Sequence, residues 1–163
     1  MNIRPATIND LPAIGLIHAF AFDNRASEPA IVMHHHLRPQ FDADLSLVAE
    51  KDGQLVGHAL FSPQTVRFSG QLVNAVNLAP IAVAPAFQGQ GIGSALMEEG
   101  HRIALQKGFA MSFLLGHADY YPRFGYLPHA YGFSEVTIDV SQYSAKGLAT
   151  RPPVAADIPA LYE

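Results

Sequence analysis

The chain has 163 residues, of which 49% are hydrophobic, it contains no cysteine, and its formal net charge is −4. This length suits one domain with a hydrophobic core. Only 10 lysines and arginines are present, without a basic run, which argues against a nucleic-acid or membrane-surface partner. The lack of cysteine excludes disulfides, a thiolate nucleophile and thiolate zinc sites. Since the N-terminus has no apolar secretory segment, we expect a soluble, cytoplasmic protein that acts on a small molecule.

The first predicted elements are a short strand and a helix. Residues 3–6 favour the strand, and apolar side chains at helical spacing predict the helix over residues 11–20. Residues 21–38 are compatible with a loop or a short second helix, whose extent Pro29 and Pro39 limit.

Three antiparallel strands are expected next. Residues 45–50 and 54–61 predict a hairpin around an Asp-Gly turn at 52–53. A turn at 69–70 then leads into a third strand over 71–78. Pro80 cannot donate to a strand ladder, so we expect the pairing to be broken or bulged there.

The second half of the chain predicts a helix followed by further strands. Helical spacing covers residues 92–107, and Gly108 supplies a stop signal. The continuous apolar run at 109–115 is typical of a buried parallel strand that is reached by a right-handed crossover. Two more strands are expected near 127–131 and 136–140.

A glycine-rich junction separates the strand at 81–83 from the predicted helix. Glycines at positions 89, 91 and 93 leave no Cβ to block a ligand, so the N–H groups from Gln88 to Gly93 can point at anionic oxygens. The positive end of the helix dipole strengthens that preference. The junction therefore predicts a diphosphate site, although a tight turn without a ligand is the plain structural alternative.

Two other glycine-loop classes fit less well. The phosphate loop of nucleotide triphosphatases requires a lysine directly after its last glycine, and no lysine follows Gly93 before Lys107. The dinucleotide fingerprint requires glycine or alanine where this chain has Ser94, and an acidic residue about 20 positions later. No Asp or Glu lies within 109–118, so the dinucleotide interpretation is weak.

A second motif follows the buried strand, with the sequence Tyr-Tyr-Pro-Arg-Phe-Gly at residues 120–125. The Gln-x-x-Gly-x-Gly spacing at 88–93, combined with Tyr-x-x-x-Gly from Tyr121 to Gly125, resembles the GNAT superfamily of N-acetyltransferases. The Tyr-Tyr-Pro-Arg-Phe-Gly run is similar to the YhbS-like branch in particular. The resemblance is strongest over residues 78–126.

The resemblance implies an α/β GNAT fold, with a mixed seven-strand sheet that splays between its fourth and fifth strands and is flanked by helices. It implies acetyl-CoA as co-substrate and direct transfer of acetyl, in a ternary complex, to a small-molecule or peptide amine. It also implies cofactor-binding positions at Ile81, Ala82, Val83, Gln88, Gly89, Gln90, Gly91, Ile92, Gly93 and Ser94. The oligomeric state stays open, with a homodimer as one option.

The resemblance places the catalytic acid at Tyr121. A phenol with a pKa near 10 is protonated at neutral pH and can deliver a proton to a departing thiolate. A backbone N–H near Val83 would stabilise the oxyanion. Tyr120 is the alternative acid, and both tyrosines could instead pack as an aromatic corner.

The general base stays undetermined. Many GNAT enzymes use a glutamate on the fourth strand, but no Asp or Glu lies between Asp52 and Glu98 here. One option is water held by Asn77 or by a backbone carbonyl. The others are His117 or His58 acting as the base, or an amine that arrives already neutral. The missing carboxylate also keeps open a catalytically silent acyl-CoA sensor or structural module, and a third hypothesis is a nucleotide-binding regulator.

The His-His-His run at residues 34–36 does not predict a metal site. Neighbouring side chains diverge on a helix and alternate on a strand, so three in a row cannot chelate one ion alone. The resemblance places this run where the acceptor-facing helix or loop lies, so it either lines that pocket or belongs to an exposed segment. We expect no bound metal.

The C-terminal residues repeat part of the N-terminus. Residues 151–161 carry Arg, Pro, Asp, Pro and Ala in the register of residues 4–14. We therefore divide the chain into an acetyltransferase domain at 1–145 and a tail at 146–163 that resembles the start of a second GNAT-like repeat. Chance similarity in short proline-rich text is the alternative.

Overall fold

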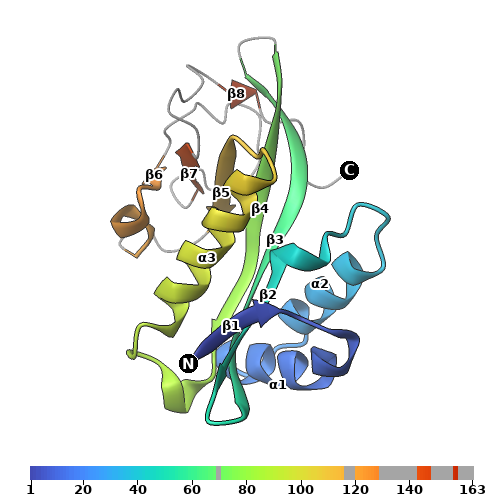
Figure 1. Ribbon diagram of the computed structural model, residues 1–163, viewed down its shortest axis with the longest axis vertical. Coiled ribbons are helices and arrows are strands. Elements are labelled where there is room, and N and C mark those ends of the chain that lie inside the picture. The colour runs from blue at the N-terminus through green and yellow to red at the C-terminus, as the bar shows by residue number, and fades with distance from the viewer. Residues whose placement is uncertain (69–70, 116–119, 129–142, 148–155, 158–163) are drawn as a thin grey trace. The chain divides into compact units, whose positions relative to one another are not determined.

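The computed structural model describes residues 1–68, 71–115, 120–128, 143–147 and 156–157 (Figure 1). The chain divides into two compact units, one formed by Met1–Ser62 with Ala79–Ile103 and the other by Pro63–Leu78 with Ala104–Glu163. The long strands β3 (Gln54–Phe68) and β4 (Gln71–Val83) contribute to both. β4 continues through Pro80, so the strand predicted to end at residue 78 extends to the glycine-rich junction.

The first unit contains the predicted hairpin. β1 (Asn2–Pro5) pairs antiparallel with β2 (Ser46–Lys51), which pairs antiparallel with β3. Asp52 and Gly53 join β2 to β3 with φ values of 52° and 75°. Two consecutive positive φ values are what a two-residue hairpin turn requires, and Asp-Gly provides them with little strain. The Asp-Gly prediction is therefore confirmed.

Three helices complete this unit: α1 (Leu11–Ala21), α2 (Ser27–His36) and the longer α3 (Ile92–Gln106), whose last residues belong to the second unit. The predictions for 11–20 and 92–107 are confirmed to within one residue at each end. The undecided segment at 21–38 contains helix α2. Pro29 does not interrupt it, because it lies in the first turn, where a backbone N–H would have no helical partner.

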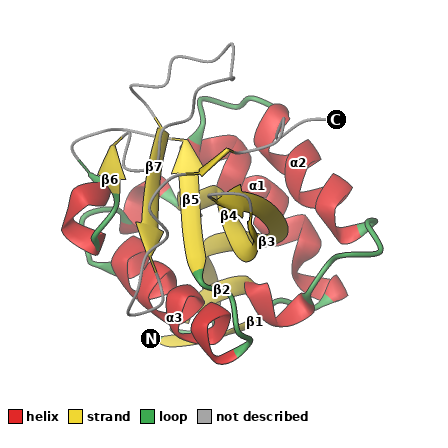
Figure 2. Cartoon of the chain, turned by 90° about the horizontal axis from the view of Figure 1, so that it is seen from above, coloured by secondary structure: helices red, strands yellow, loops and turns green. Residues whose placement is uncertain are grey.

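Alternate residues of β3 face different helices of the first unit. His58 and Ser62 form side-chain hydrogen bonds to α1 and α2. Gly57 and Phe61 instead contact α3. Because side chains alternate across a strand, α3 covers one face of the sheet and α1 with α2 covers the other (Figure 2). A core cluster of Ile14, Val32 and Val48 lies on the face that α1 and α2 cover.

Close packing of α3 on β3 requires a glycine at position 100. A Cβ on Gly100 would overlap the ring of Phe61, which is fully buried. Overpacking typically costs about 1–3 kcal/mol, and the direct overlap with the Phe61 ring places this case at the upper end, above the roughly 1 kcal/mol that alanine gains over glycine in a helix. We therefore expect Gly100→Ala to lower the free energy of unfolding, measured by denaturant titration.

Gly15 in α1 is the matched control for this substitution. A Cβ on Gly15 meets no atom within 4 Å, so Gly15→Ala should stabilise the protein by about 1 kcal/mol through helix propensity alone. If the two alanine variants changed stability in the same direction, the packing argument for Gly100 would be wrong.

In the second unit, β4 pairs in parallel with β5 (Met111–Leu115), from Ala75↔Met111 to Asn77↔Phe113. The parallel strand predicted at 109–115 is thus confirmed, except that it begins at Met111. Before that point, the Ala110 N–H donates to the carbonyl of Asn74 at 2.9 Å.

The described residues add three shorter strands to the second unit. β7 (Tyr143–Gly147) pairs antiparallel with β5, and β6 (Leu127–Pro128) pairs with β7. β8 (Ala156–Asp157) pairs with the end of β3. β6 confirms the start of the strand predicted at 127–131, whereas the strand predicted at 136–140 lies outside the described residues.

The strand order is β1-β2-β3-β4-β5-β7-β6, with β8 paired to β3 beside this path. Parallel and antiparallel pairs occur together, so the mixed α/β class is confirmed. The predicted number of seven strands is not, because the described residues form eight. The proposed division into a domain at 1–145 and a tail at 146–163 stays a prediction. β7 crosses the boundary between residues 145 and 146, and β8 lies within the proposed tail.

Candidate functional site

The glycine-rich junction connects the end of β4 to the start of α3, entirely within the first unit. Gly89 and Gly91 have φ values of 74° and 78°, in the left-handed region that favours glycine. A Cβ at either position would meet no atom within 4 Å. The two glycines therefore make the turn possible and leave the space above the backbone open.

The Gln88 N–H donates to the Pro85 carbonyl at 3.3 Å, whereas the amides that follow it in the junction are available to a ligand. The helical hydrogen bonds of α3 begin at the Ala95 N–H, which donates to the Gly91 carbonyl at 3.0 Å. The N–H groups that precede it are the ones that a helix N-terminus leaves without an intrahelical partner. Those of Gly89, Gln90 and Gly91 belong to exposed residues. This combination favours an anionic ligand.

Two glutamine side chains hold the junction from within. Gln88 Nε2 donates to the Val83 carbonyl at 3.0 Å, and Gln90 Nε2 donates to the Ala86 carbonyl at 3.4 Å. Both side chains thus satisfy carbonyl groups of the turn. Their role in the free protein is to shape the backbone that presents the amides.

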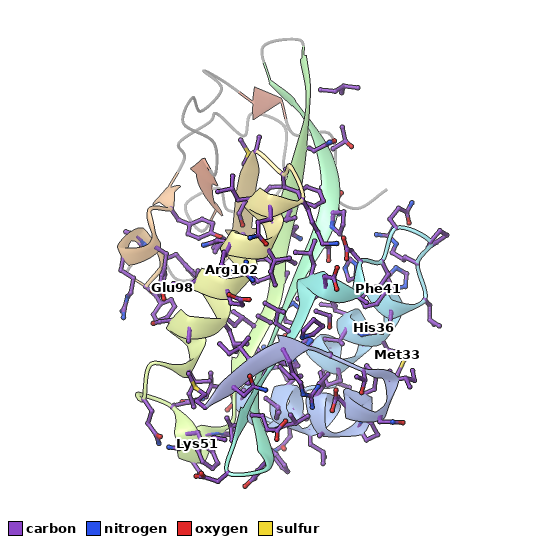
Figure 3. All side chains as sticks on the ribbon, viewed as in Figure 1. Met33, His36, Phe41, Lys51, Glu98 and Arg102 are labelled. Atoms are coloured by element: carbon purple, nitrogen blue, oxygen red, sulfur yellow. The ribbon has the colours of Figure 1, made fainter. Side chains whose placement is uncertain are left out.

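A cation lies beside the junction. Lys51, at the end of β2, donates from Nζ to Gln90 Oε1 at 2.9 Å and lies 5.9 Å from the centre of the Phe87 ring (Figure 3). No ion pair with a carboxylate is found for Lys51 within the described ranges. Its charge adds to the positive potential of the helix N-terminus, and the sequence pattern gave no reason to select it.

The other predicted cofactor positions lie at the end of β4. Ala82 is buried, and Ile81 and Val83 are half-buried. The Ala84 N–H donates to the Val56 carbonyl of β3 at 2.9 Å, which fixes this end of the strand. The ten predicted cofactor-binding residues therefore belong to one continuous structural segment, from β4 into the first turn of α3.

Tyr121 begins a short 3-10 helix, Tyr121–Phe124, in the second unit, and Gly125 ends it with a φ of 82°. Burial raises the pKa of the Tyr121 phenol, and the neighbouring Tyr120 raises it further. The phenol is therefore protonated at neutral pH. For the described part of the chain, ring packing against Tyr120 and Tyr126 is found, but no hydrogen bond of the Tyr121 hydroxyl.

The two neighbouring tyrosines have structural contacts. Tyr126 is fully buried, and its hydroxyl lies 2.7 Å from Ser112 Oγ. Tyr120 packs under the guanidinium of Arg123, which lies 4.3 Å from its ring centre. Among the described residues, these contacts engage the hydroxyl of Tyr126 and leave those of Tyr120 and Tyr121 available.

His58, one of the bases considered from the sequence, is enclosed in the core. Its Nδ1 lies 2.8 Å from His18 Nε2 and its Nε2 lies 3.0 Å from Ser46 Oγ, and all three residues are fully buried. Burial lowers the pKa of both histidines, that of His18 to about 4. Since both ring nitrogens of His58 are engaged in the core, His58 cannot act as a base on an amine substrate. His117 lies outside the described residues.

The three consecutive histidines lie at the end of α2 and face different surroundings. His34 is exposed. His35 is half-buried, with Nδ1 3.2 Å from Ser62 Oγ of β3. His36 is also half-buried, donates from Nδ1 to the Val32 carbonyl at 2.8 Å and packs on Phe41 (Figure 3). Where side chains are described, no group of three metal-binding residues comes together.

Within the described residues, no helix has both the length and the apolar character that a membrane crossing requires.

Residues 2–128 match a family described as "Acetyltransferase (GNAT) domain". The uncharacterized N-acetyltransferase YjhQ of Escherichia coli strain K12 is 39% identical over 115 residues, which is 69% of this chain and 60% of that protein. The chain thus spans less than two thirds of the length of YjhQ.

Two solved structures are similar over nearly the whole chain. A GNAT family acetyltransferase from Brucella melitensis, in complex with acetyl-CoA, has a TM-score of 0.76 at 29% identity and covers 99% of this chain and 97% of its own. YhbS from Escherichia coli, in complex with CoA, has a TM-score of 0.79 at 28% identity. The similarity covers 97% of this chain and 89% of the YhbS chain.

Proposed function

Because the chain belongs to the GNAT family of acetyltransferases, we propose that it binds acetyl-CoA and transfers the acetyl group directly to an amine. The observation that carries this proposal is the open glycine junction, whose exposed amides precede α3 beside the cation of Lys51. A diphosphate matches that arrangement in charge and in hydrogen bonding. The structures of similar proteins with acetyl-CoA and CoA support the choice of carrier.

We propose that the pantetheine arm lies along the last part of β4. The register between β4 and β5 ends at Asn77 and Phe113, although β4 continues to Val83. A strand that continues beyond its partner's register offers backbone groups to an extended ligand. This is the feature expected if the fourth and fifth strands splay.

The reaction requires both substrates together. The neutral amine attacks the thioester carbonyl, and a backbone N–H near Val83 stabilises the oxyanion that forms. The carbon–sulfur bond then breaks, and the Tyr121 hydroxyl donates its proton to the leaving thiolate. The nitrogen of the tetrahedral intermediate loses a proton that restores the phenol. The products are an amide and coenzyme A.

The acceptor is a small-molecule or peptide amine. The test is release of the free thiol from acetyl-CoA in the presence of amines, amino acids, polyamines, aminoglycosides and peptides, combined with calorimetric titration of acetyl-CoA. We expect tight binding of acetyl-CoA and amine-dependent thiol release with at least one class. Binding of NAD in place of acetyl-CoA, or binding without turnover for every class, would contradict the proposal.

A substitution in the junction should separate cofactor affinity from stability. Gly91→Ala introduces a Cβ at a positive φ, which costs about 1–2 kcal/mol of backbone strain and distorts the amides that face the diphosphate. We expect the Kd for acetyl-CoA to rise at least about tenfold, or about 1.4 kcal/mol, in calorimetric titration.

Gly108, beyond the other end of α3, is the matched control. It has a φ of 83°, and its Cβ would also meet no atom within 4 Å. Gly108→Ala should therefore lose similar stability while keeping the wild-type Kd. Equal Kd values of the two variants for acetyl-CoA would mean that the junction does not belong to the binding site.

A further inference from the structure

An amine acceptor must lose a proton before it can react with the thioester. An alkyl amine is mostly an ammonium ion at neutral pH, and only its neutral form can attack a thioester. A group on the acceptor side must therefore take up a proton. No Asp or Glu lies between Asp52 and Glu98, so neither β3 nor β4 carries a carboxylate for this purpose.

The acceptor should approach on the face of the sheet that α1 and α2 cover. The junction that we propose to hold the diphosphate leads into α3, which lies on the opposite face. In a direct transfer the amine must reach the thioester from a side that the carrier itself does not fill. Side chains on the α1 and α2 face are therefore the candidates for the proton acceptor.

His35 is placed on this face with a geometry that suits a base. Its ring extends from α2 to β3, where Nδ1 lies 3.2 Å from Ser62 Oγ. In the tautomer whose Nδ1–H donates to Ser62, Nε2 keeps its lone pair and can accept a proton. The side chain is half-buried, so it is both held in place and accessible.

The other described histidines of this unit fit the role less well. His18 and His58 are fully buried and bonded to each other. His101 is buried against Phe61 on the α3 face. His34 is exposed, and His36 bonds within its own helix to the Val32 carbonyl. His35 is the one that combines access with a hydrogen bond to a strand next to β4.

We propose that His35 is the general base of the acetyl transfer and that Ser62 positions its ring. The proposal rests on the proposed function, because it needs an amine acceptor. One proton of the ammonium passes to His35 Nε2 and from there to solvent. The second proton lost by the nitrogen replaces the one that Tyr121 gives to the thiolate. The overall reaction thus releases one proton for each acetyl group transferred.

The electrostatic surroundings agree with this role. Burial lowers the pKa of His35, and the charge of Arg38, together with the charges that His34 and His36 carry when protonated, lowers it further. Ser62, its partner on β3, carries no charge. His35 is therefore neutral at pH 7, ready to accept a proton, and its protonated form returns the proton to solvent readily.

The test compares His35→Gln with wild type, using the panel amine with the highest turnover, over a range from about pH 6 to pH 9. At pH 7 we expect kcat/KM to fall about 100-fold. The loss should shrink as the pH rises, because the amine then loses its proton to solvent without help. The Kd for acetyl-CoA should stay at the wild-type value, which shows that the cofactor site is intact.

Three further variants sharpen the test. His34→Gln changes an exposed histidine on the same helix and should keep kcat/KM within a few fold of wild type, because it removes only one of the charges that lower the pKa of His35. Ser62→Ala should give a smaller loss of kcat than His35→Gln, with the same dependence on pH, because the ring is still present but less well oriented. His36→Gln should likewise keep kcat/KM within a few fold of wild type at each pH.

Several outcomes would overturn the assignment. The first is a wild-type kcat/KM for His35→Gln at pH 7. The second is a loss of kcat/KM in His35→Gln that is the same at every pH. The third is a pH-dependent loss of kcat/KM that occurs in His36→Gln and not in His35→Gln. These results would leave the proposed function intact, since wild type would still bind acetyl-CoA and turn over the amine. If the wild-type protein neither bound acetyl-CoA nor turned over an amine, the proposed function would be wrong, and the role of His35 would be wrong with it.

Discussion

Tyr121→Phe is expected to lower kcat by about 10²- to 10⁴-fold while leaving the Kd for acetyl-CoA unchanged. The substitution removes one hydroxyl and keeps the ring that packs against Tyr120 and Tyr126. Loss of a positioned general acid typically has an effect of this size. The measurement is steady-state thiol release with the best panel amine, combined with calorimetric titration of acetyl-CoA.

Tyr120→Phe is the control for this prediction. Its ring contacts with Tyr121 and Phe124, and its packing under Arg123, do not depend on the hydroxyl. We expect kcat within a few fold of wild type. A large loss in Tyr120→Phe with little in Tyr121→Phe would reassign the acid. Full activity of both variants would mean that the thiolate leaves without a tyrosine.

The second large effect concerns stability in mild acid. His18 is fully buried, its Nε2 lies 2.8 Å from His58 Nδ1, and its own Nδ1 has no hydrogen-bond partner among the described residues. Burial lowers its pKa from 6.5 to about 4 in the folded state, while the charge of Glu28 acts weakly in the opposite direction. The folded protein therefore resists protonation at a site that the unfolded chain protonates readily.

The sign of the pH dependence follows from this difference. Between about pH 6.5 and pH 4 the unfolded chain binds more protons at His18 than the folded protein, so stability falls as the pH falls. A shift of this size corresponds to a loss of about 3 kcal/mol across that range. His58, whose pKa burial also lowers, adds to the same slope.

Urea denaturation at a series of pH values measures this slope. His18→Gln keeps a hydrogen-bonding group but does not titrate, so its stability should depend less on pH than that of wild type. His34→Gln changes an exposed histidine and should retain the wild-type slope. Wild-type stability that stays constant from pH 7 to about pH 4.5 would contradict the burial of a neutral histidine pair.

Sequence reasoning found the features that depend on local chemistry. The glycine junction was predictable because positive φ values at Gly89 and Gly91, and a helix that starts at Ile92, are fixed by residues next to each other in the chain. The Asp-Gly hairpin turn is predictable for the same reason. Helix α3 shows clear apolar periodicity, and α1 is rich in apolar residues at helical spacing.

The features it missed depend on contacts between distant residues. α2 has weak amphipathic character and is stabilised by packing such as that of Val32 in the core, so the sequence left this segment undecided. The contact of His35 with Ser62 joins residues 27 positions apart. His58 could not be recognised as a core residue, because the burial of its partner His18 is set by the packing of α1 on the sheet. β7 carries no strong strand pattern and is held by its pairing with β5.

The missing carboxylate on β3 and β4 first suggested a silent acyl-CoA sensor as an alternative. The position of His35 offers a proton acceptor from α2 in its place, so the absence of a strand carboxylate does not argue against catalysis. The two hypotheses also differ in the Tyr121→Phe result, because a sensor would keep both its affinity and its lack of turnover.

The most direct test of the account is a crystal structure of the protein grown with acetyl-CoA. We predict that the diphosphate oxygens accept hydrogen bonds from backbone N–H groups between Gln88 and Gly93, and that the thioester sulfur lies within reach of the Tyr121 hydroxyl. A carrier bound with its diphosphate away from these amides, or with its sulfur remote from Tyr121, would contradict the account.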